Sequence, residues 1–213
     1  MNCDPNLEPF SLSLAFFQVM EFYFNLITER STKNPAKYPS VYTFGTFFYT
    51  RLEKGQALGR WARKLDFFSY DLLIVPIIHA SHWRLVVSSR LLKNSRQQLL
   101  LISNFFFLLF SSQVVKIREK RIEYYDSMGN PFPACVNAIV KFLQAESREK
   151  GAKVELDLSQ WSIVHRVPGI PLQNNGYDCG VFACKYAEYI ARRAPITFTQ
   201  VTFSAAVVTT TID

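Results

Sequence analysis

Hydrophobic residues recur along the chain with two different periods, which predict both helices and strands. Residues 19–30 (VMEFYFNLITER) and 134–150 carry apolar side chains at the spacing of amphipathic helices. Residues 71–76 (DLLIVP) form a short apolar run closed by a proline, which is typical of a buried central strand. Further strands are expected at residues 82–87, 121–126 and 160–167. Helices and strands in this order predict an α+β fold.

Two more segments are expected to be helical. Residues 41–52 (VYTFGTFFYTRL) begin with β-branched and aromatic residues but end in a helix-compatible run, and we expect a helix there. After residue 179, apolar or aromatic residues stand at positions 182, 186, 189 and 190, which is a helical spacing. The Asn-Gly pair and Gly180 just before this segment are typical of a turn. A loop that enters a helix at residue 179 is therefore predicted.

The composition indicates one packed globular domain. The chain has 213 residues, of which 49% are hydrophobic and 15% aromatic, enough for a full core in a single domain. The formal charge of +7 and the pI near 9.3 are compatible with a nucleic acid, an acidic membrane surface or an acidic protein as partner. The basic residues are scattered and form no nucleic-acid-binding motif, so we expect no nucleic acid partner.

The sequence predicts neither a membrane segment nor a bound metal. The most apolar stretch, residues 99–110, is shorter than the about 20 residues of a spanning helix, and the first residues lack the basic region of a signal peptide. The cysteines, Cys3, Cys135, Cys179 and Cys184, show no CxxC pair and no metal-ligand spacing with a histidine. We therefore expect no membrane association, no disulfide framework, no metal, no cofactor and a reducing compartment.

Cys179 is the residue in the chain whose surroundings most resemble those of a nucleophile. At a helix start, unpaired backbone N–H groups and the positive end of the helix dipole favour a thiolate and lower the thiol pKa. A thiolate is the reactive form of cysteine. Taken alone, Cys179 would also fit a small buried hydrophobic residue, which is what we expect for Cys184.

Three other residues complete a catalytic set. His82 opens the strand HWRLVV and would be the general base, while Asp126 ends the strand RIEYYD and would orient the imidazole. Gln173, six residues before Cys179, would donate a side-chain N–H to a developing oxyanion. Each residue alone has an ordinary structural explanation, and no supporting pattern accompanies His79 or His165.

Together, the motifs DLLIVP…HW, YYDSMG and QNNGYDCGVFACKYAEYI resemble the sentrin/SUMO-specific (Ulp-type) cysteine proteases of the papain-like clan. The resemblance covers about residues 19–87 and 114–200. It implies a papain-like fold with a small mixed sheet flanked by helices. It also implies His82 as base, Asp126 as its orienting group, Cys179 as nucleophile and Gln173 as oxyanion donor.

The same resemblance implies a substrate and contacts to it. The expected reaction is hydrolysis of the bond after the C-terminal Gly-Gly of SUMO, in isopeptide conjugates, in the precursor or in both. Trp83 would cover the narrow channel that admits the two glycines, and Phe47, Arg60 and Trp61 would touch the globular body of the modifier. A basic surface would suit an acidic modifier. The resemblance further implies a monomer that acts in the nucleus, with a cytoplasmic pool also compatible.

Three stretches depart from the family pattern and divide the chain. We predict a divergent N-terminal segment at 1–18, a catalytic domain at 19–200 interrupted by an insertion at 88–113, and a divergent tail at 201–213. The runs SLSLAFFQ and NFFFLLFSSQ are what a pyrimidine tract ending in CAG would encode, so one hypothesis is that all three stretches derive from introns. Resequencing the cDNA tests it.

The departures leave other functions open. The chain could be a catalytically impaired module that binds a ubiquitin-like modifier, or a non-functional product of a transcript that retains intron sequence. A processing protease of viral type from the same clan would share the thiol, histidine and aspartate chemistry.

Overall fold

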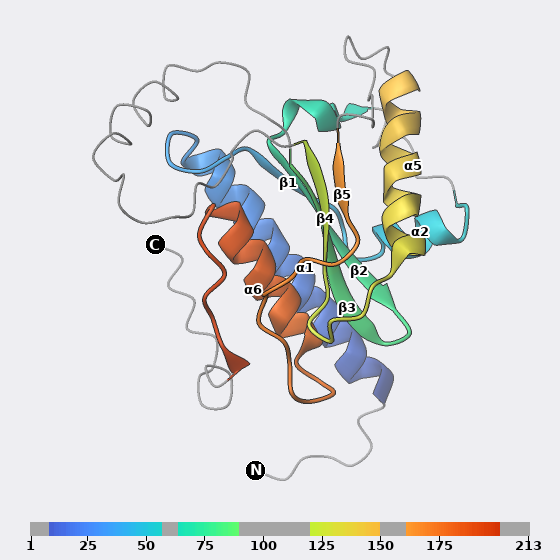
Figure 1. The fold of residues 1–213 in the computed structure, drawn as a ribbon, viewed down its shortest axis with the longest axis vertical. Helices are drawn as coiled ribbons and strands as arrows, with labels where there is room; N and C mark the ends of the chain where they lie inside the picture. The colour runs from blue at the N-terminus through green and yellow to red at the C-terminus, as the bar shows by residue number, and fades with distance from the viewer. Residues whose placement is uncertain (1–8, 57–63, 90–119, 150–160, 201–213) are drawn as a thin grey trace.

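A five-stranded mixed sheet forms the centre of the protein (Figure 1). The computed structural model describes residues 9–56, 64–89, 120–149 and 161–200, with side chains from Phe16 onward. The strands lie in the order β1-β2-β3-β4-β5, and their bounds are Val41–Thr43, Leu72–His79, His82–Ser89, Arg121–Tyr125 and Ser162–Val164. The inner pairs β2–β3 and β3–β4 are antiparallel, whereas β1 and β5 run parallel to their neighbours.

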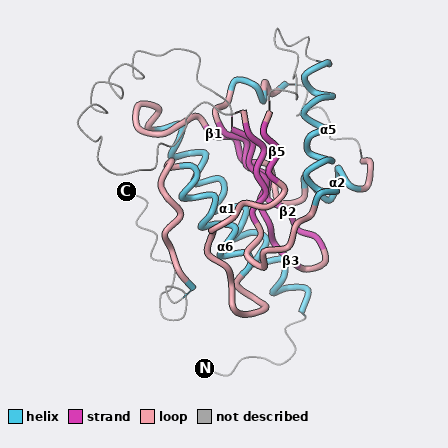
Figure 2. The backbone as a smooth tube through the Cα atoms, in the orientation of Figure 1, coloured by secondary structure: helices cyan, strands magenta, loops and turns pink. Residues whose placement is uncertain are grey.

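Helices cover both faces of this sheet. Helices α1 (Pro9–Lys33) and α6 (Cys179–Ala191) lie side by side against one face, and α2 (Phe48–Glu53) and α5 (Pro133–Glu149) lie on the other (Figures 1 and 2). A short 3₁₀ helix spans Phe67–Ser69 before β2. The predicted α+β fold, with a small mixed sheet flanked by helices, is confirmed.

The apolar run of β2 supplies both hydrophobic cores because its side chains alternate between the two faces. Leu73, Val75 and Ile77 pack into the core beneath α2 and α5. Leu72 and Ile74 pack into the core beneath α1 and α6. Burial on both faces explains why this strand reads as a continuous hydrophobic stretch rather than an alternating one.

Strand β2 does not end at Pro76, contrary to our expectation, but continues to His79. The carbonyl of Ile74 accepts a hydrogen bond from Phe44 at the β1 edge, and the backbone nitrogen of Pro76 faces the same edge two residues later. Since β1 ends at Thr43, which pairs with Ile74, the proline has no partner strand there. Its missing N–H therefore costs no ladder hydrogen bond.

Segment 41–52 is also different from the expected single helix. Its first three residues form β1, paired with β2, and only Phe48–Glu53 is helical. The β-branched and aromatic residues at its start fit a pleated sheet better than a helix. The prediction was wrong for residues 41–43 because pairing with β2 decides the conformation there.

The other helices and strands lie where the hydrophobic pattern predicted them, but their ends are shifted. Helix α5 lies within one residue of its predicted bounds, and the strand expected at 160–167 is shortened to Ser162–Val164. Helix α1 begins at Pro9, ten residues earlier than the expected start at Val19, and runs through the 18/19 boundary without a break. Ser88 and Ser89 of the predicted insertion belong to β3. The remainder of the insertion and the tail at 201–213 lie outside the described residues.

The turn between β2 and β3 consists of Ala80 and Ser81, and both are in the left-handed region, with φ of 49° and 58°. Two consecutive residues with positive φ form the tight hairpin that suits the twist of the strands. Such turns favour Gly, which has no Cβ to clash in the left-handed conformation, and Asn, whose short polar side chain can hydrogen-bond locally. These two strained residues lie immediately before His82.

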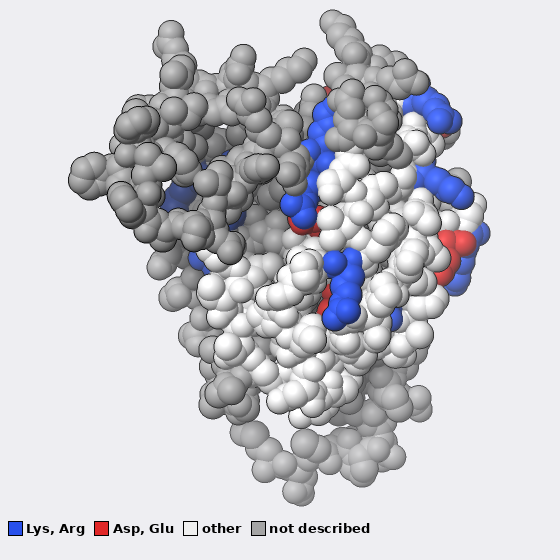
Figure 3. Space-filling model, in the orientation of Figure 1, with Lys and Arg blue, Asp and Glu red and all other residues white. Residues whose placement is uncertain are grey.

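On the face shown in Figure 3, the basic side chains of the described residues stand in separate patches rather than in a single continuous one. The lower part of the face shown in Figure 3 is largely uncharged. Within the described part of the chain, no helix has the length and hydropathy to cross a membrane, and no cluster of His, Cys, Asp or Glu has the arrangement of a metal site.

Candidate active site

Cys179 is the first residue of α6, as the sequence predicted. The side-chain amide of Asn175 holds the preceding loop. Its Oδ1 accepts hydrogen bonds from the backbone N–H groups of Tyr177 and Asp178, and its Nδ2 donates to Oδ2 of Asp178 at 2.8 Å. The cysteine is buried, with 6% of its surface exposed. Loop geometry thus fixes the thiol at the N-terminal end of a helix.

His82 and Asp126 meet because neighbouring antiparallel strands present them at the same end of the sheet. His82 is the first residue of β3, and Asp126 directly follows β4. Nε2 of His82 lies 2.7 Å from Oδ1 of Asp126, and both side chains are buried. The predicted pairing of a histidine with an orienting carboxylate is present in the structure.

The second carboxylate oxygen of Asp126 is also occupied. Oδ2 accepts from Nε of Arg84 at 3.3 Å and from the hydroxyl of Tyr124 at 3.3 Å. The backbone N–H of Met128 donates to Oδ1 at 2.8 Å. Burial by itself raises the pKa of Asp126, but these donors and the imidazole together hold it below its ordinary value. The residue is therefore a carboxylate at neutral pH.

The thiol and the imidazole shift each other's pKa values in opposite directions. Burial would raise the pKa of Cys179, yet hydrogen bonding from the His82 side chain and from the backbone N–H groups of Trp83 and Gly180 lowers it. Burial would lower the pKa of His82, but its bonds to Asp126 and Cys179 raise it to about 9. Both shifts favour a thiolate beside an imidazolium.

The ring nitrogen that faces the thiol is Nδ1 of His82. Among the described residues, no group completes a well-aligned hydrogen bond to this buried nitrogen, while Nε2 is already paired with Asp126. The contact with Cys179 is thus looser than the contact with the carboxylate. Loose geometry between nucleophile and base is common when no substrate is bound.

Gln173 lies in the loop before α6 and is tied to the strand end that carries Asp126. Its backbone N–H donates to the carbonyl of Ser127 at 2.9 Å, and its Oε1 accepts from the Ser127 hydroxyl at 2.5 Å. Nε2 donates to the carbonyl of Asn175 at 2.5 Å. Because an amide nitrogen carries two N–H bonds, one remains for another acceptor. An oxyanion role for Gln173 stays a prediction.

Trp83 is buried beneath an aromatic cluster that α1 supplies. Its indole lies 6.1 Å from the ring of Phe16 and 5.1 Å from that of Phe17 between centroids. Phe17 also stacks on Phe47 at 4.9 Å, and about half of the Phe47 surface is exposed. A Cβ placed at Gly180 would lie only 2.4 Å from Phe16, so this contact requires glycine. We call Phe16, Phe17, Phe47 and Trp83 the aromatic cover.

Two of the proposed modifier contacts, Arg60 and Trp61, lie outside the described residues. Cys184 is packed against the core beneath α1 and α6, with its sulfur 3.3 Å from that of Met20, and burial raises its pKa. It behaves as the buried apolar residue we expected. His79 is paired with His82 across the β2–β3 strands, but its partly exposed side chain forms an ion pair with Glu53 at 3.2 Å and not with Asp126.

Sequence reasoning missed Arg84 and Ser127, which hold the polar residues of the site. Ser127 could have been noted from the sequence because it follows Asp126 directly, whereas Arg84 comes opposite Asp126 only when the β3–β4 pairing is extended by one step from Leu85–Tyr125. A register is a property of paired strands, so it required the structure.

A comparison with protein families gives the site its context. Residues 17–210 match the model of the Ulp1 protease family, C-terminal catalytic domain. The chain belongs to the Ulp1 protease family. The match spans the segments that carry His82, Asp126 and Cys179, and it confirms the resemblance read from the sequence motifs.

Curated relatives of this Ulp1-family chain come from animals and plants. Sentrin-specific protease 2 of Homo sapiens is 37% identical over 186 residues, which is 86% of this chain and 26% of the relative. A sentrin-specific protease of Caenorhabditis elegans is 35% identical over 185 residues, covering 86% of this chain and 22% of the relative. The chain thus spans about a quarter of the length of these two curated relatives.

Solved Ulp1 domains share the fold. The C-terminal Ulp1 protease domain in complex with Smt3, the yeast ortholog of SUMO, matches with a TM-score of 0.56 and 27% identity over 85% of this chain and 67% of that one. A SUMO protease Ulp1 whose catalytic cysteine is oxidised to a sulfonic acid matches with a TM-score of 0.57 and 26% identity, over 84% and 67%. The expected papain-like architecture is therefore confirmed.

Proposed function

We propose that this chain is a SUMO-specific cysteine protease that hydrolyses the bond after the C-terminal Gly-Gly of the modifier. The observation that carries the proposal is the ordered set of Cys179 at a helix start, His82 beside it and Asp126 at 2.7 Å from the far side of the imidazole. A thiolate, a base and an orienting carboxylate are the groups that acyl transfer through a thioester requires.

The reaction begins with attack of the Cys179 thiolate on the carbonyl carbon of the last glycine. The carbonyl oxygen becomes an oxyanion, for which the backbone N–H of Cys179 and the free N–H of Gln173 are the proposed donors. Nδ1 of the His82 imidazolium then gives its proton to the departing amine, and a thioester remains. His82 next takes a proton from water, the hydroxide attacks the thioester, and the Cys179 thiolate leaves.

Asp126 serves this cycle by holding one imidazole tautomer and orientation. Its bond to Nε2 leaves Nδ1 as the nitrogen that exchanges protons with the substrate and water. Its negative charge also stabilises the imidazolium formed with the thiolate. The raised pKa of His82, to about 9, supports a preformed ion pair at neutral pH.

Two features support SUMO as the modifier. The solved Ulp1 domain with which this chain shares its fold was captured with a SUMO ortholog, and the net charge of +7 would favour an acidic partner. In this proposal, Trp83 covers the tail that ends in two glycines, while Phe47, Arg60 and Trp61 contact the body of the modifier. Both isopeptide conjugates and precursors present the same Gly-Gly carbonyl to Cys179.

One observation favours a second candidate, a module that binds the modifier without turnover. Phe16 and Phe17 lie against Trp83, and Phe16 is pressed on Gly180 beside the nucleophile. An extended tail that passes over Trp83 needs the space beside that indole. If these rings keep their positions when the modifier binds, the tail does not reach Cys179.

A cleavage assay separates the two candidates. The purified chain and a Cys179→Ser variant are each incubated with a SUMO–lysine isopeptide conjugate and with a SUMO precursor extended beyond Gly-Gly. Release of the amine by the native chain, abolished in the variant, supports the protease. Binding of SUMO by both proteins in calorimetry, with no release by either, supports the module and contradicts the protease.

We further propose that the chain acts as a monomer in the nucleus, with no nucleic acid partner. The expected readouts are a molar mass of one chain in light scattering, nuclear fluorescence of a tagged chain and no shift of a DNA or RNA probe. A concentration-dependent dimer, exclusion from the nucleus or salt-sensitive binding of the probe would each contradict its part of this proposal.

A further inference from the structure

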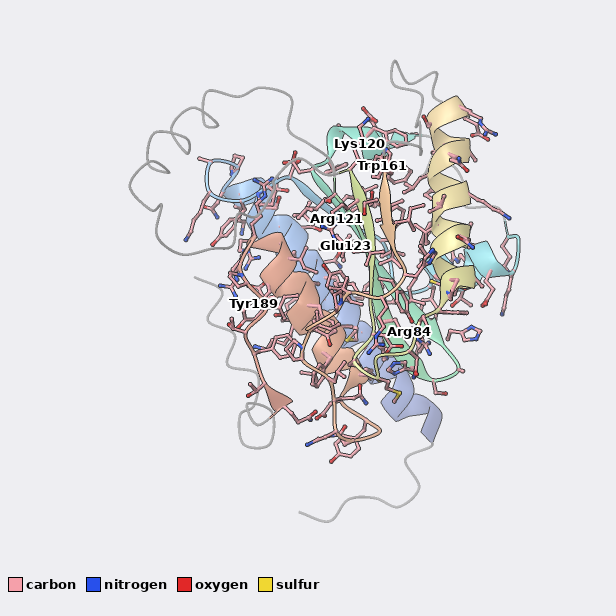
Figure 4. All side chains as sticks on the ribbon, viewed as in Figure 1. Arg84, Lys120, Arg121, Glu123, Trp161 and Tyr189 are labelled. Carbon is pink, nitrogen blue, oxygen red and sulfur yellow. The ribbon has the colours of Figure 1, made fainter. Side chains whose placement is uncertain are left out.

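Arg84 is placed at the catalytic end of the sheet by the strand register. It is two residues after His82 on β3, and its side chain lies on the same face as His82 because side chains alternate along a strand. The β3–β4 register extended by one pair sets it directly across from Asp126. Figure 4 shows Arg84 at the lower end of the sheet, near the β2–β3 turn, and far from Arg121 and Glu123 at the other end of β4.

The guanidinium joins three parts of the site that no other described side chain joins. Nε donates to Oδ2 of Asp126 at 3.3 Å. NH1 donates to the carbonyl of His79 at 3.0 Å and to that of His82 at 3.4 Å. The side chain is 14% exposed, and its guanidinium carbon lies 5.4 Å from the ring centroid of Phe132. The planar group is thus held from two sides.

The two carbonyls belong to the residues that flank the strained turn. Ala80 and Ser81 have positive φ, so the hairpin keeps this conformation only while its ends are fixed. Strand pairing of His79 with His82 supplies part of that restraint, and Arg84 bonds to the same two residues. A shift of the turn would move the imidazole of His82 directly.

The two carboxylate oxygens of Asp126 are divided between the two basic groups. Oδ1 faces His82 at 2.7 Å and Oδ2 faces Arg84. With one oxygen bonded to a fixed guanidinium, rotation of the carboxylate about its terminal torsion is restricted, so the other oxygen stays aimed at Nε2. The arginine therefore acts on the catalytic histidine through the carboxylate and through the turn.

We propose that Arg84 is a positioning residue for the catalytic histidine, holding Asp126 and the β2–β3 turn in one arrangement. This inference rests on the proposed function, since it assigns a role within the same site. Arg84 is then a fixed cation beside the thiol, imidazole and carboxylate. It holds two separate parts of the site, the Asp126 carboxylate and the β2–β3 turn.

A cation at this position also has an electrostatic consequence. The charged and titratable groups around His82 are Asp126 after β4, Tyr124 of β4, His79 of β2 with its partner Glu53 of α2, Cys179 and Tyr186 of α6, and Cys135 of α5. Within this set, the positive charge of Arg84 opposes protonation of His82 and favours the ionised form of Asp126. Removing it would raise the pKa of His82 further, even where the fold is unchanged.

The test compares Arg84→Met, Arg84→Lys and the matched control Arg121→Met in the full chain. Arg121 is on the neighbouring strand and paired with Glu123 at 2.9 Å, far from the site. For Arg84→Met we expect kcat for a SUMO–lysine conjugate to fall about 10–100-fold, with KM nearly unchanged. Arg84→Lys should restore part of kcat, and Arg121→Met should match the native chain.

A second readout does not depend on turnover. The chain has 3 histidines, so the His82 ring can be assigned and titrated by NMR in a His79→Gln, His165→Gln background. Arg84→Met should move its pKa upward by about 0.5–1 pH unit, whereas Arg121→Met should not. If the chain proves inactive, this titration still shows whether the charge of Arg84 acts on His82.

Three results would overturn the inference. One is a native kcat together with a native His82 titration in Arg84→Met. Another is a loss of kcat that follows the unfolded fraction in circular dichroism, with no rescue by lysine. The third is an equal titration shift in Arg121→Met, which would indicate a general effect of net charge rather than a local contact.

Discussion

The proposed catalytic residues and the aromatic cover adjoin each other at Trp83 and Gly180, yet the two groups are held together by different forces. His82 and Asp126 are buried polar groups whose hydrogen bonds fix distance and direction. Phe16 and Phe17 are held on Trp83 by ring packing, which tolerates small displacements. Hydrogen bonds therefore fix the geometry of His82 and Asp126, whereas access of a substrate to Cys179 depends on ring packing that is easier to rearrange.

This difference in the kind of contact predicts a difference in the effect of mutation. Damage to the polar group should reduce the rate constant with little change in fold or binding. Substitutions in the aromatic cover should instead change the apparent affinity for the modifier or let its tail reach Cys179. The experiments below follow that division, beginning with the largest expected effect.

Asp126→Asn should have the largest effect. The amide would keep the size of the side chain but remove the charge that stabilises the imidazolium, and it would favour the wrong tautomer of His82. We expect kcat to fall about 1,000-fold, with SUMO affinity in calorimetry unchanged. A fall of less than tenfold would mean that the carboxylate only supports the fold.

The pH profile of the native chain should show the ion pair of Cys179 and His82. Because the pKa of the thiol is lowered and that of the imidazole is raised to about 9, kcat/KM should be level around neutral pH. It should fall about tenfold per pH unit once the imidazolium is lost above about 9. An alkaline limb near the ordinary histidine pKa of about 6.5 would contradict the ion pair.

Phe16→Ala combined with Phe17→Ala tests the aromatic cover. If the rings obstruct the tail of the modifier, kcat/KM should rise about tenfold, because about 1–2 kcal/mol of ring packing no longer has to be broken when the tail enters. Val19→Ala, at an exposed position on the same helix, is the matched control and should leave cleavage unchanged. A higher KM in the double variant would instead show that the rings bind the tail.

The smallest expected effect concerns the β2–β3 turn. Ala80→Asn with Ser81→Gly would place in it the residue pair that best accepts two positive φ angles. We expect an increase of about 1 kcal/mol in the free energy of unfolding, seen as about 2–4 °C in Tm. The control is Arg193→Gly, which places glycine at another residue with positive φ, outside the site. Equal cleavage by all three proteins would show that the turn residues themselves are not needed for His82 to function.

Much of the catalytic group was predictable from the sequence because each member lies at the end of an element. The end of the run DLLIVP, the strand HWRLVV and the Gly-rich entry to α6 indicated where His82 and Cys179 would lie. The positions predicted for α5 and α6 also agree with the structure. Local periodicity is a property of consecutive residues, and it can be read without knowledge of the fold.

Pairing and long-range packing were not predictable in the same way. Val41–Thr43 is a strand only because β2 lies beside it, and Arg84 reaches Asp126 only because of the β3–β4 register. The contact of Phe16 with Gly180 joins residues from opposite ends of the described chain. The hydrogen bonds that lower the thiol pKa also include donors from another element: those from His82 and the backbone N–H of Trp83 on β3 contribute more than that from Gly180 at the helix start.

The pairing of α1 with α6 also bears on how the protein is made. Arg30 on α1 forms a partly buried salt bridge with Glu188, 158 residues later, at 2.6 Å, and the two helices share one core (Figure 1). On a ribosome, α1 emerges long before α6, and the part of its apolar face that packs on α6 stays uncovered until that helix has been synthesised. Cys179, the proposed nucleophile, is the first residue of that same late helix. In the proposed function, completion of this core and placement of the thiol beside His82 are therefore one event.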